Sequence, residues 1–218
     1  NGRMAEPADL ENLRREYRTR PLQRTDLATD PIVQFKQWFT EALDASVLDV
    51  NAMSIATVAA DGQPSLRTVL LKHFDTSGFV FYTNLDSRKA REMAGNARVA
   101  LLFYWAEVSR QVRISGTVSR VSVAESLRYF LPRPRDSQIG AWVSEQSRVV
   151  EGRQFLETKF NELKARFAAG EVPLPAFWGG FRVAAQTMEF WQARENRLHD
   201  RFLYSRNTTG WTIDRLAP

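Results

Sequence analysis

The sequence predicts a mainly β fold with peripheral helices (α+β), in which an antiparallel sheet curls into a barrel. About eight stretches rich in β-branched and aromatic residues are joined mostly by tight turns, and strands joined in this way pair antiparallel. The strand–helix alternation of a parallel doubly wound sheet is absent from the sequence. Antiparallel strands in this number favour closure into a barrel.

Capping, turn and periodicity signals define the individual elements. Asp30 and Pro31 supply an N-cap and a first-turn proline, and apolar residues at helical spacing predict a helix from there to near Ser46. Ser87 and Ser122 are the predicted N-caps of two shorter helices. The expected strands cover residues 52–59, 65–74, 79–83, 99–104, 111–121, 181–192, 198–205 and 211–216, and the expected helices cover residues 8–20, 31–46, 87–96, 122–131 and 150–169.

No internal repeat or convincing linker divides the 218 residues. We therefore expect a single domain over residues 26–218, preceded by an N-terminal arm over residues 1–25 that carries the basic helix at 8–20.

Composition excludes several classes of function. The chain has no cysteine, which excludes disulfides, thiolate catalysis and cysteine-ligated metal centres, and its two histidines argue against a multi-histidine metal site. No apolar run is long enough to span a bilayer, and no signal region stands at the N-terminus. We expect a cytoplasmic protein with no bound metal and no membrane partner.

The charge pattern indicates a small anionic ligand. The net charge is +5, and the basic residues fall in several short sets separated by apolar strands. Sets that converge after folding suit phosphorylated small molecules better than a nucleic acid. The sequence contains no GxGxxG, GxxxxGK[ST] or GxSxG motif, so a phosphate must be held mainly by side chains and local backbone amides.

Two stretches of the predicted barrel carry candidate anion-binding groups. Arg67 and Lys72 have opposite parity, which places them on different faces of a regular strand; this fits two separate phosphates or two solvated strand ends. Ser87, Arg88 and Lys89 form a hydroxyl-capped helix start with two cations in its first turn. Cations oppose the helix dipole at that position, so a bound anion would account for them.

A third candidate set spans a helix end and a proline-rich turn. Tyr129, Arg133 and Ser137 lie at steps of four residues. A phenol, a guanidinium and a hydroxyl that converge would suit a phosphate monoester. The alternative interpretation is a surface corner without a ligand.

The densest group of charge lies near the C-terminus. Arg197, His199 and Arg201 alternate in sequence, so they share one face if the segment is extended. Three such groups on one face repel each other unless an anionic or electron-rich ligand lies in front of them. The alternative is an exposed edge strand that carries solvated charge.

Together these residues resemble the pyridoxine/pyridoxamine 5′-phosphate oxidase family, over nearly the whole chain. The most specific part is Glu189-Phe190-Trp191-Gln192, then four residues, then Arg197-Leu198-His199-Asp200-Arg201. Supporting blocks lie at residues 67–72, 81–84, 87–89, 133–142 and 177–181, and Met188 stands where the family usually has a branched aliphatic residue. The resemblance implies an antiparallel FMN-binding split β-barrel with a Greek-key-like topology, working as a homodimer with FMN at the subunit interface.

The resemblance also implies an activity. The family oxidises pyridoxine 5′-phosphate and pyridoxamine 5′-phosphate to pyridoxal 5′-phosphate in vitamin B6 salvage. Hydride passes from C4′ to flavin N5, and O2 reoxidises the flavin, giving hydrogen peroxide. The protein supplies position and electrostatics, and the flavin supplies the chemistry.

The family's functional residues map onto this sequence by position. The implied FMN contacts are Arg67, Thr68, Val69, Leu70, Leu71, Lys72, Tyr82, Thr83, Arg88, Lys89, Gln111, Gln146, Ser147, Trp191 and Arg201. The implied substrate contacts are Arg14, Tyr17, Lys72, Tyr129, Arg133, Ser137, Arg197 and His199. Arg197 and His199 would act at the pyridine ring as catalytic residues, with His199 either a base or a positioning group, while Arg14 and Tyr17 would close over the site.

Two alternatives remain at the level of sequence. Another split-barrel FMN oxidoreductase with a different substrate would keep the flavin residues and lack the second phosphate set. A nucleic-acid-binding module would need a continuous basic and aromatic groove, which the sequence does not indicate.

Overall fold

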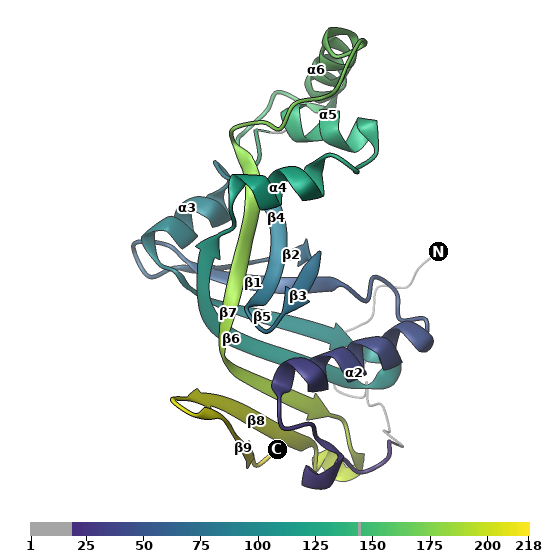
Figure 1. The fold of residues 1–218 in the computed structure, drawn as a ribbon, viewed down its shortest axis with the longest axis vertical. Coiled ribbons are helices and arrows are strands. Elements are labelled where there is room, and N and C mark those ends of the chain that lie inside the picture. Colours follow the sequence, from purple (N-terminus) through teal and green to yellow (C-terminus); the bar gives the residue numbers. More distant parts are fainter. Residues whose placement is uncertain (1–18, 144) are drawn as a thin grey trace, which may run out of the picture.

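The structure, a computed structural model, describes residues 19–143 and 145–218. Figure 1 shows one strongly curved sheet with helices at its ends and edges. The strands are β1 (Ala52–Val58), β2 (Pro64–Leu70), β3 (His73–Asp75), β4 (Gly78–Asn84), β5 (Arg98–Trp105), β6 (Arg110–Arg120), β7 (Trp178–Gln192), β8 (Asp200–Asn207) and β9 (Gly210–Arg215). The helices are α2 (Pro31–Asp44), α3 (Arg88–Gly95), α4 (Val123–Phe130), α5 (Arg135–Val143) and α6 (Arg153–Arg166), with 3₁₀ turns η1 (Arg24–Asp26), η2 (Ala106–Val108) and η3 (Glu195–Arg197).

The two edges of the curled sheet are connected by a two-residue segment, which we call the seam. Its strand order is β2-β1-β5-β6-β7-β4-β3, and every pair in it is antiparallel. The outermost strands β2 and β3 are consecutive in the chain, with only Leu71 and Lys72 between them. The Leu71 amide donates to the Asn51 carbonyl at 2.8 Å, and the Lys72 amide donates to the Val80 carbonyl at 2.8 Å. The seam thus joins the two edges of a barrel, which confirms the predicted architecture.

Strand β7 runs the length of the molecule and changes partners along one edge. Its first part pairs with β4, its last part pairs with β8, and β6 lies along its other edge. The register with β6 shifts between Ser115 and Gly116, near the point where β7 changes partners. A Cβ on Gly116 would lie 2.1 Å from the Ala184 carbonyl oxygen, so only glycine allows this close approach. Figure 1 shows that α5 and α6 lie at one end of β7. The strands β8 and β9 and the helix α2 lie near its other end.

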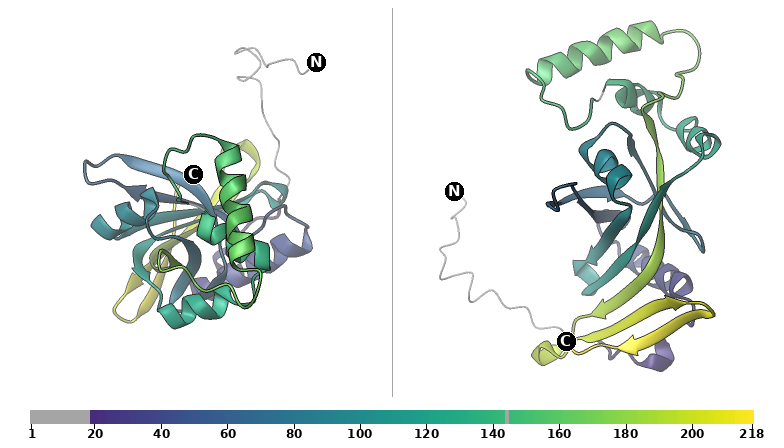
Figure 2. Two further views of the ribbon diagram at one scale, coloured as in Figure 1. Left: turned by 90° about the horizontal axis from the view of Figure 1, so that it is seen from above. Right: turned by 90° about the vertical axis from the view of Figure 1, so that its left-hand side faces the viewer.

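The barrel core is aromatic and is covered by α2. Asp30 caps this helix by accepting a hydrogen bond from the Ile32 amide at 2.7 Å, as predicted. Phe35 on α2 is fully buried and meets the rings of Phe79 and Phe103 edge-on, with centroids 5.0 Å apart in each pair. A second cluster holds α4, α5 and α6 at the far end; its buried members are Phe130, Ile139, Ala141, Phe167, Val172 and Trp178. The views in Figure 2 show these helices stacked beyond the barrel.

Three local predictions differ from the structure. The expected strand at 65–74 is wrong, because the chain leaves β2 at Leu70 and re-enters the sheet at His73. Helix α5 was not predicted, since Pro132 and Pro134 indicated a turn and the helix begins directly after them. Arg197 does not lie on a strand: it ends η3 with a φ of 60°, and β8 begins at Asp200.

None of the helices in the described residues is both long and apolar enough to cross a membrane. Arg14, Tyr17 and positions 8–18 of the expected N-terminal helix lie outside the described residues.

Candidate functional site

A cavity of about 920 Å³ opens between β2, β4, the start of α3 and the corner between α4 and α5. It is lined by Arg67, Thr68, Val69, Leu70, Lys72, Tyr82, Thr83, Asn84, Arg88, Lys89, Tyr129, Arg133, Pro134, Ser137, Gly140, Ala141, Gln146, Ser147 and Trp178. Five of these lining residues are Arg or Lys, and none of them is Asp or Glu. A cavity with this excess of positive charge concentrates anions.

The seam explains why Arg67 and Lys72 reach the same cavity. Their opposite parity would place them on different faces of a continuous strand. Because β2 ends at Leu70 and Leu71 turns into the core, Lys72 returns to the side on which Arg67 lies. The two cations therefore line one cavity, and the prediction that they lie on different faces is wrong.

Lys89 is a buried ammonium group in the cavity wall. Its Nζ donates to Thr83 Oγ1 at 3.0 Å and to Gln146 Oε1 at 2.7 Å, and both partners are uncharged. Burial lowers the pKa of Lys89 to about 8, and repulsion from Arg67 adds to the shift. A cation in this position gains most from an added anion, because none of the described residues supplies it with a counter-charge.

The start of α3 has the predicted form of an anion site. Ser87 is the N-cap, and its Oγ accepts a hydrogen bond from the Ala90 amide at 3.4 Å. The amide of Arg88 donates to Ser147 Oγ at 3.2 Å, so the Gln146–Ser147 loop is held against this helix end. This helix start suits a phosphate group, because it combines two cations in the first turn, backbone amides and a nearby hydroxyl.

The wall opposite is built from stacked aromatic rings and one incompletely satisfied arginine. The rings of Tyr82 and Tyr129 stack at 4.0 Å between centroids and 9° between planes, and Tyr82 stacks on Trp178 at 5.4 Å. The guanidinium of Arg133 lies 5.0 Å from the Trp178 ring centroid. Its Nη1 is buried without a hydrogen-bond partner, and burial lowers the pKa of Arg133. Since Ser137 lines the same wall, the three residues predicted at steps of four do converge on one cavity.

A second group of predicted residues forms a row across three strands. Gln111 on β6 is the cross-strand partner of Trp191 on β7, and Trp191 is the partner of Arg201 on β8. Directly paired residues point to the same face of a sheet. Nε of Arg201 donates to Glu189 Oε1 at 2.8 Å, a contact that raises the pKa of Arg201. We call Gln111, Trp191 and Arg201 the outer row.

His199 lies beside the outer row, ahead of β8. Its ring is 4.7 Å from the Trp191 ring, and its Nδ1 accepts a hydrogen bond from the Arg194 amide at 3.1 Å. Burial lowers the pKa of His199, repulsion from Arg197 lowers it further, and Asp200 opposes both. Arg197 is exposed on the η3 turn. The expected alternating face is therefore wrong as a strand feature, although His199 and the outer row are neighbours.

The cavity and the outer row lie at opposite ends of β7. Trp178, the first residue of β7, lines the cavity, and Trp191 is the penultimate residue of the same strand. A strand rises about 3.3 Å per residue, so roughly 40 Å separates these positions along an extended chain. One chain therefore carries two separate groups of predicted site residues, one at each end of β7.

The structure thus divides the predicted site residues into four groups. The cavity contains Arg67, Thr68, Val69, Leu70, Lys72, Tyr82, Thr83, Arg88, Lys89, Tyr129, Arg133, Ser137, Gln146 and Ser147. The outer row and its neighbours contain Gln111, Trp191, Arg197, His199 and Arg201. Leu71 is a core residue at the seam, and Arg14 and Tyr17 lie outside the described residues.

Sequence reasoning missed two residues that shape the cavity. Trp178 supports Arg133 and Tyr82, and its signal was the Phe177–Phe181 block noted for the resemblance. Glu92 lies behind the wall and pairs with Arg67 and Arg88. Its position four residues after Arg88 on an expected helix was the available signal.

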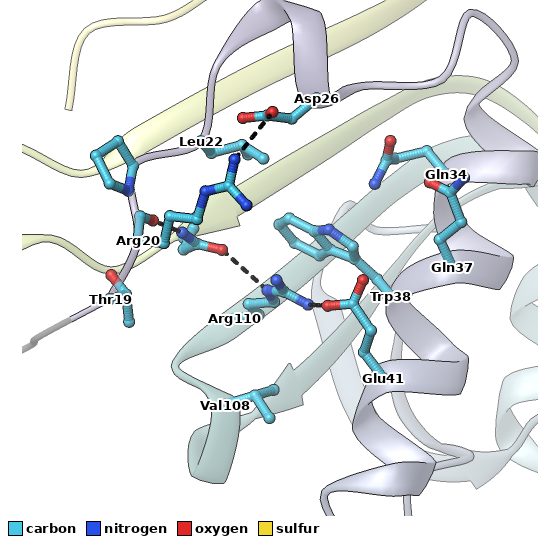
Figure 3. Close-up of a pocket in the computed structure, with 12 residues that line it drawn as sticks. Thr19, Arg20, Leu22, Asp26, Gln34, Gln37, Trp38, Glu41, Val108 and Arg110 are labelled. Carbon is cyan, nitrogen blue, oxygen red and sulfur yellow. Dashed lines mark hydrogen bonds and ion pairs between the residues drawn. The ribbon is translucent and has the colours of Figure 1, made fainter.

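A separate cavity of about 520 Å³ lies between α2 and the segment at residues 19–22 (Figure 3). Its charges are balanced: Arg110 pairs with Glu41, and Arg20 lies 3.8 Å from Asp26. Arg110 also stacks over Trp38, with its guanidinium carbon 4.4 Å from the ring centroid. None of its lining residues is a predicted site residue.

The fold and the cavity define a split-barrel protein with a cationic pocket, whose charge suits an anionic ligand. Residues 39–167 match the family model described as pyridoxamine 5′-phosphate oxidase, and residues 178–218 match the pyridoxine 5′-phosphate oxidase C-terminal dimerisation region. A pyridoxine/pyridoxamine 5′-phosphate oxidase from Aeromonas hydrophila subsp. hydrophila is 55% identical over 210 residues, covering 96% of this chain and all of that protein. The chain belongs to the pyridoxine/pyridoxamine 5′-phosphate oxidase family of oxidoreductases.

Two solved structures share the fold of this chain. PhzG from Burkholderia lata 383, in complex with tetrahydrophenazine-1-carboxylic acid, superposes with a TM-score of 0.84 at 31% identity, covering 89% of this chain and 95% of that one. A pyridoxamine 5′-phosphate oxidase-related, FMN-binding protein from Nostoc punctiforme PCC 73102 has a TM-score of 0.69 at 16% identity, covering 84% of this chain and 97% of that one, and shares the fold.

Proposed function

We propose that this chain is an FMN-dependent oxidase that converts pyridoxine 5′-phosphate and pyridoxamine 5′-phosphate to pyridoxal 5′-phosphate. O2 is the final electron acceptor and is reduced to hydrogen peroxide; with the amine substrate, water is also consumed and ammonia is released. The observation that carries the proposal is the cavity with five cationic and no acidic lining residues, in a chain of this family. Cofactor and substrate each bring a phosphate, and this charge excess matches them.

The residues present fit FMN. Lys89, with neutral partners only, and the amide-bearing start of α3 at Arg88 form a site for its phosphate, to which Gln146 and Ser147 contribute polar groups. Arg67 approaches from β2 on the same cavity. When bound, FMN supplies the hydride acceptor for oxidation at the C4′ carbon of the substrate and passes the electrons to O2.

A separate set fits the substrate phosphate. Arg133 presents a buried Nη1 for which none of the described residues supplies an acceptor, and Tyr129 and Ser137 line the cavity beside it. Leaving a buried guanidinium N–H unpaired is costly, and a phosphate oxygen would satisfy it. Lys72 at the seam supplies further positive charge.

The cavity and the outer row are two half-sites of this proposal, and the groups that orient the substrate ring lie beside the outer row. A neutral imidazole whose Nδ1 accepts a hydrogen bond carries its hydrogen on Nε2. Because the Arg194 amide donates to Nδ1 of His199, this ring acts as a hydrogen-bond donor that orients the substrate, rather than as a base. Arg197 stabilises charge that develops on the substrate ring.

Both half-sites serve one ligand pair in a homodimer, with FMN at the subunit interface. Two observations support this arrangement: β7 keeps the half-sites apart within a chain, and residues 178–218 match a dimerisation region. The cavity of one subunit then faces the outer row of its partner. This is an isologous arrangement that forms two equivalent sites.

The test begins with purified protein. It should release FMN on denaturation, take up oxygen with either phosphorylated substrate, and form pyridoxal 5′-phosphate together with peroxide. Pyridoxine without its phosphate should be oxidised far more slowly, since Arg133 then lacks its partner. A protein that remains inactive after FMN is added would overturn the proposal.

The shared site has its own test. A cavity variant, Lys89→Met, and an outer-row variant, Trp191→Ala, should each be nearly inactive as homodimers. Subunits exchanged between them should regain about a quarter of wild-type activity, because half of the dimers then hold one intact site. No recovery in verified mixed dimers would place each site within one chain.

A further inference from the structure

Glu92 is a buried carboxylate to which the proposed reaction gives no role. It lies four residues after Arg88 on α3, so the two side chains share a face of the helix. Its Oε1 accepts a hydrogen bond from Nε of Arg88 at 2.7 Å, and its Oε2 lies 3.3 Å from Nη2 of Arg67. Glu92 does not line the cavity, whereas both arginines do.

The hairpin formed by β1 and β2 holds the same carboxylate from the other side. Thr57 and Ser65 are cross-strand partners, and their hydroxyls donate to Oε2 of Glu92 at 2.5 and 2.6 Å. Burial opposes the ionisation of Glu92, but the hydrogen bonds from Ser65, Thr57 and Arg88 outweigh it and lower its pKa to about 2. The group is therefore charged at neutral pH and fixed between two elements.

This carboxylate connects two arginines that come from different parts of the fold. Arg67 projects from β2, and it also donates to Ile55, Thr57 and Ser65. Among the described residues, the Arg88 guanidinium contacts the protein only through its Nε, which leaves both Nη groups for a ligand. One buried anion thus sets the orientation of two cations that line the same cavity.

We propose that Glu92 is a positioning residue for FMN, which holds Arg67 and Arg88 in the arrangement that binds the flavin phosphate. The inference rests on the proposed function, because it requires that this phosphate occupies the start of α3. Two effects of Glu92 oppose each other. Its negative charge by itself repels a phosphate, whereas its hydrogen bonds pre-organise the two guanidinium groups.

The direction in which the Kd for FMN changes in a Glu92→Gln variant separates these effects. FMN and riboflavin differ only by the phosphate, so the ratio of their dissociation constants for flavin-free protein isolates the phosphate contribution. We expect Glu92→Gln to raise the Kd for FMN about tenfold or more and to change the Kd for riboflavin less than about twofold. An unchanged or lower Kd for FMN would overturn the inference, since loss of the negative charge alone tightens binding.

A matched control and a milder variant complete the experiment. Glu125→Gln removes a carboxylate that pairs with Arg182, outside the cavity, and should leave the FMN-to-riboflavin ratio unchanged. Ser65→Ala removes one of the bonds to Glu92 and should give an intermediate loss, which keeps the test decisive if Glu92→Gln does not fold. A wild-type protein that binds both flavins equally would instead refute the proposed phosphate site, independently of Glu92.

Discussion

The imidazole of His199 lies 4.7 Å from the indole of Trp191, with 42° between the two planes, and its Nδ1 accepts the Arg194 amide. The indole packs against the imidazole ring, and the hydrogen bond at Nδ1 fixes one edge of the imidazole. A group fixed in one tautomer is suited to orienting a substrate.

This relationship predicts a difference between two substitutions at His199. His199→Leu should lower turnover by well over about tenfold while FMN remains bound, and His199→Gln should retain clearly more activity, because an amide can still donate. Steady-state oxygen uptake and flavin absorbance measure both quantities. His73→Gln, at the chain's other histidine, is the control and should behave as wild type. Equal losses in the two variants would indicate that His199 is a base.

Arg197 should control the pH dependence of turnover. Burial and then Arg197 lower the pKa of His199, so Arg197→Ala should raise that pKa, in addition to lowering turnover. Since the proposed role requires neutral His199, the acid limb of the pH profile should move to higher pH in the variant. Turnover measured between about pH 5 and 8 tests this. Arg206→Ala, an exposed arginine on β8, should not move the limb. A shift to lower pH would contradict the assignment.

Arg133 should affect substrate affinity without supporting the fold. Arg133→Met should raise KM for pyridoxine 5′-phosphate more than about tenfold and change turnover at saturation much less. Its thermal midpoint without substrate should not fall, because the variant removes a buried, unpaired Nη1. Arg128→Met, exposed on α4, serves as the control. An unchanged KM would remove Arg133 from the substrate site.

Lys89 should make FMN binding weaken in alkaline solution. Its pKa is lowered to about 8, so the ligand-free side chain loses its charge as the pH rises through that value, and the phosphate then loses a partner. Fluorescence titration between about pH 7 and 9 should show the Kd for FMN rising in wild type. Lys89→Met should bind weakly throughout and lack this step, while Lys36→Met, exposed on α2, should retain it. The same pH dependence in Lys89→Met and wild type would contradict the role.

The sequence predicted the strands and the barrel well, because alternation and turn chemistry act locally. Asp30, Ser87 and Ser122 cap their helices as expected, for the same reason. The break at Leu71 was not predictable from pattern: residues 65–74 read as one strand, and only closure of the barrel requires the chain to leave the sheet there. The parity argument for Arg67 and Lys72 failed for that reason.

The sequence predicted which residue types form the candidate site. It did not predict the arrangements that depend on three-dimensional geometry. Tyr129, Arg133 and Ser137 converge because α5 starts directly after two prolines, which spacing alone could not establish. Arg197 has a positive φ and does not lie on the strand, although positions 197, 199 and 201 alternate in the sequence. The spacing of Glu92 from Arg88 predicts only an ion pair within the helix, and its contact with Arg67 on β2 is visible only in the structure.

Tyr82 pairs with the start of β7, and Trp191 lies near the end of the same strand. Because β7 keeps these two residues apart within one chain, they could contact each other only across the proposed dimer. Within one chain, correlated variation between such positions would imply a contact that the length of the strand forbids. In an alignment of relatives, these correlations would therefore report the packing of two subunits and mislead any attempt to derive the fold of one.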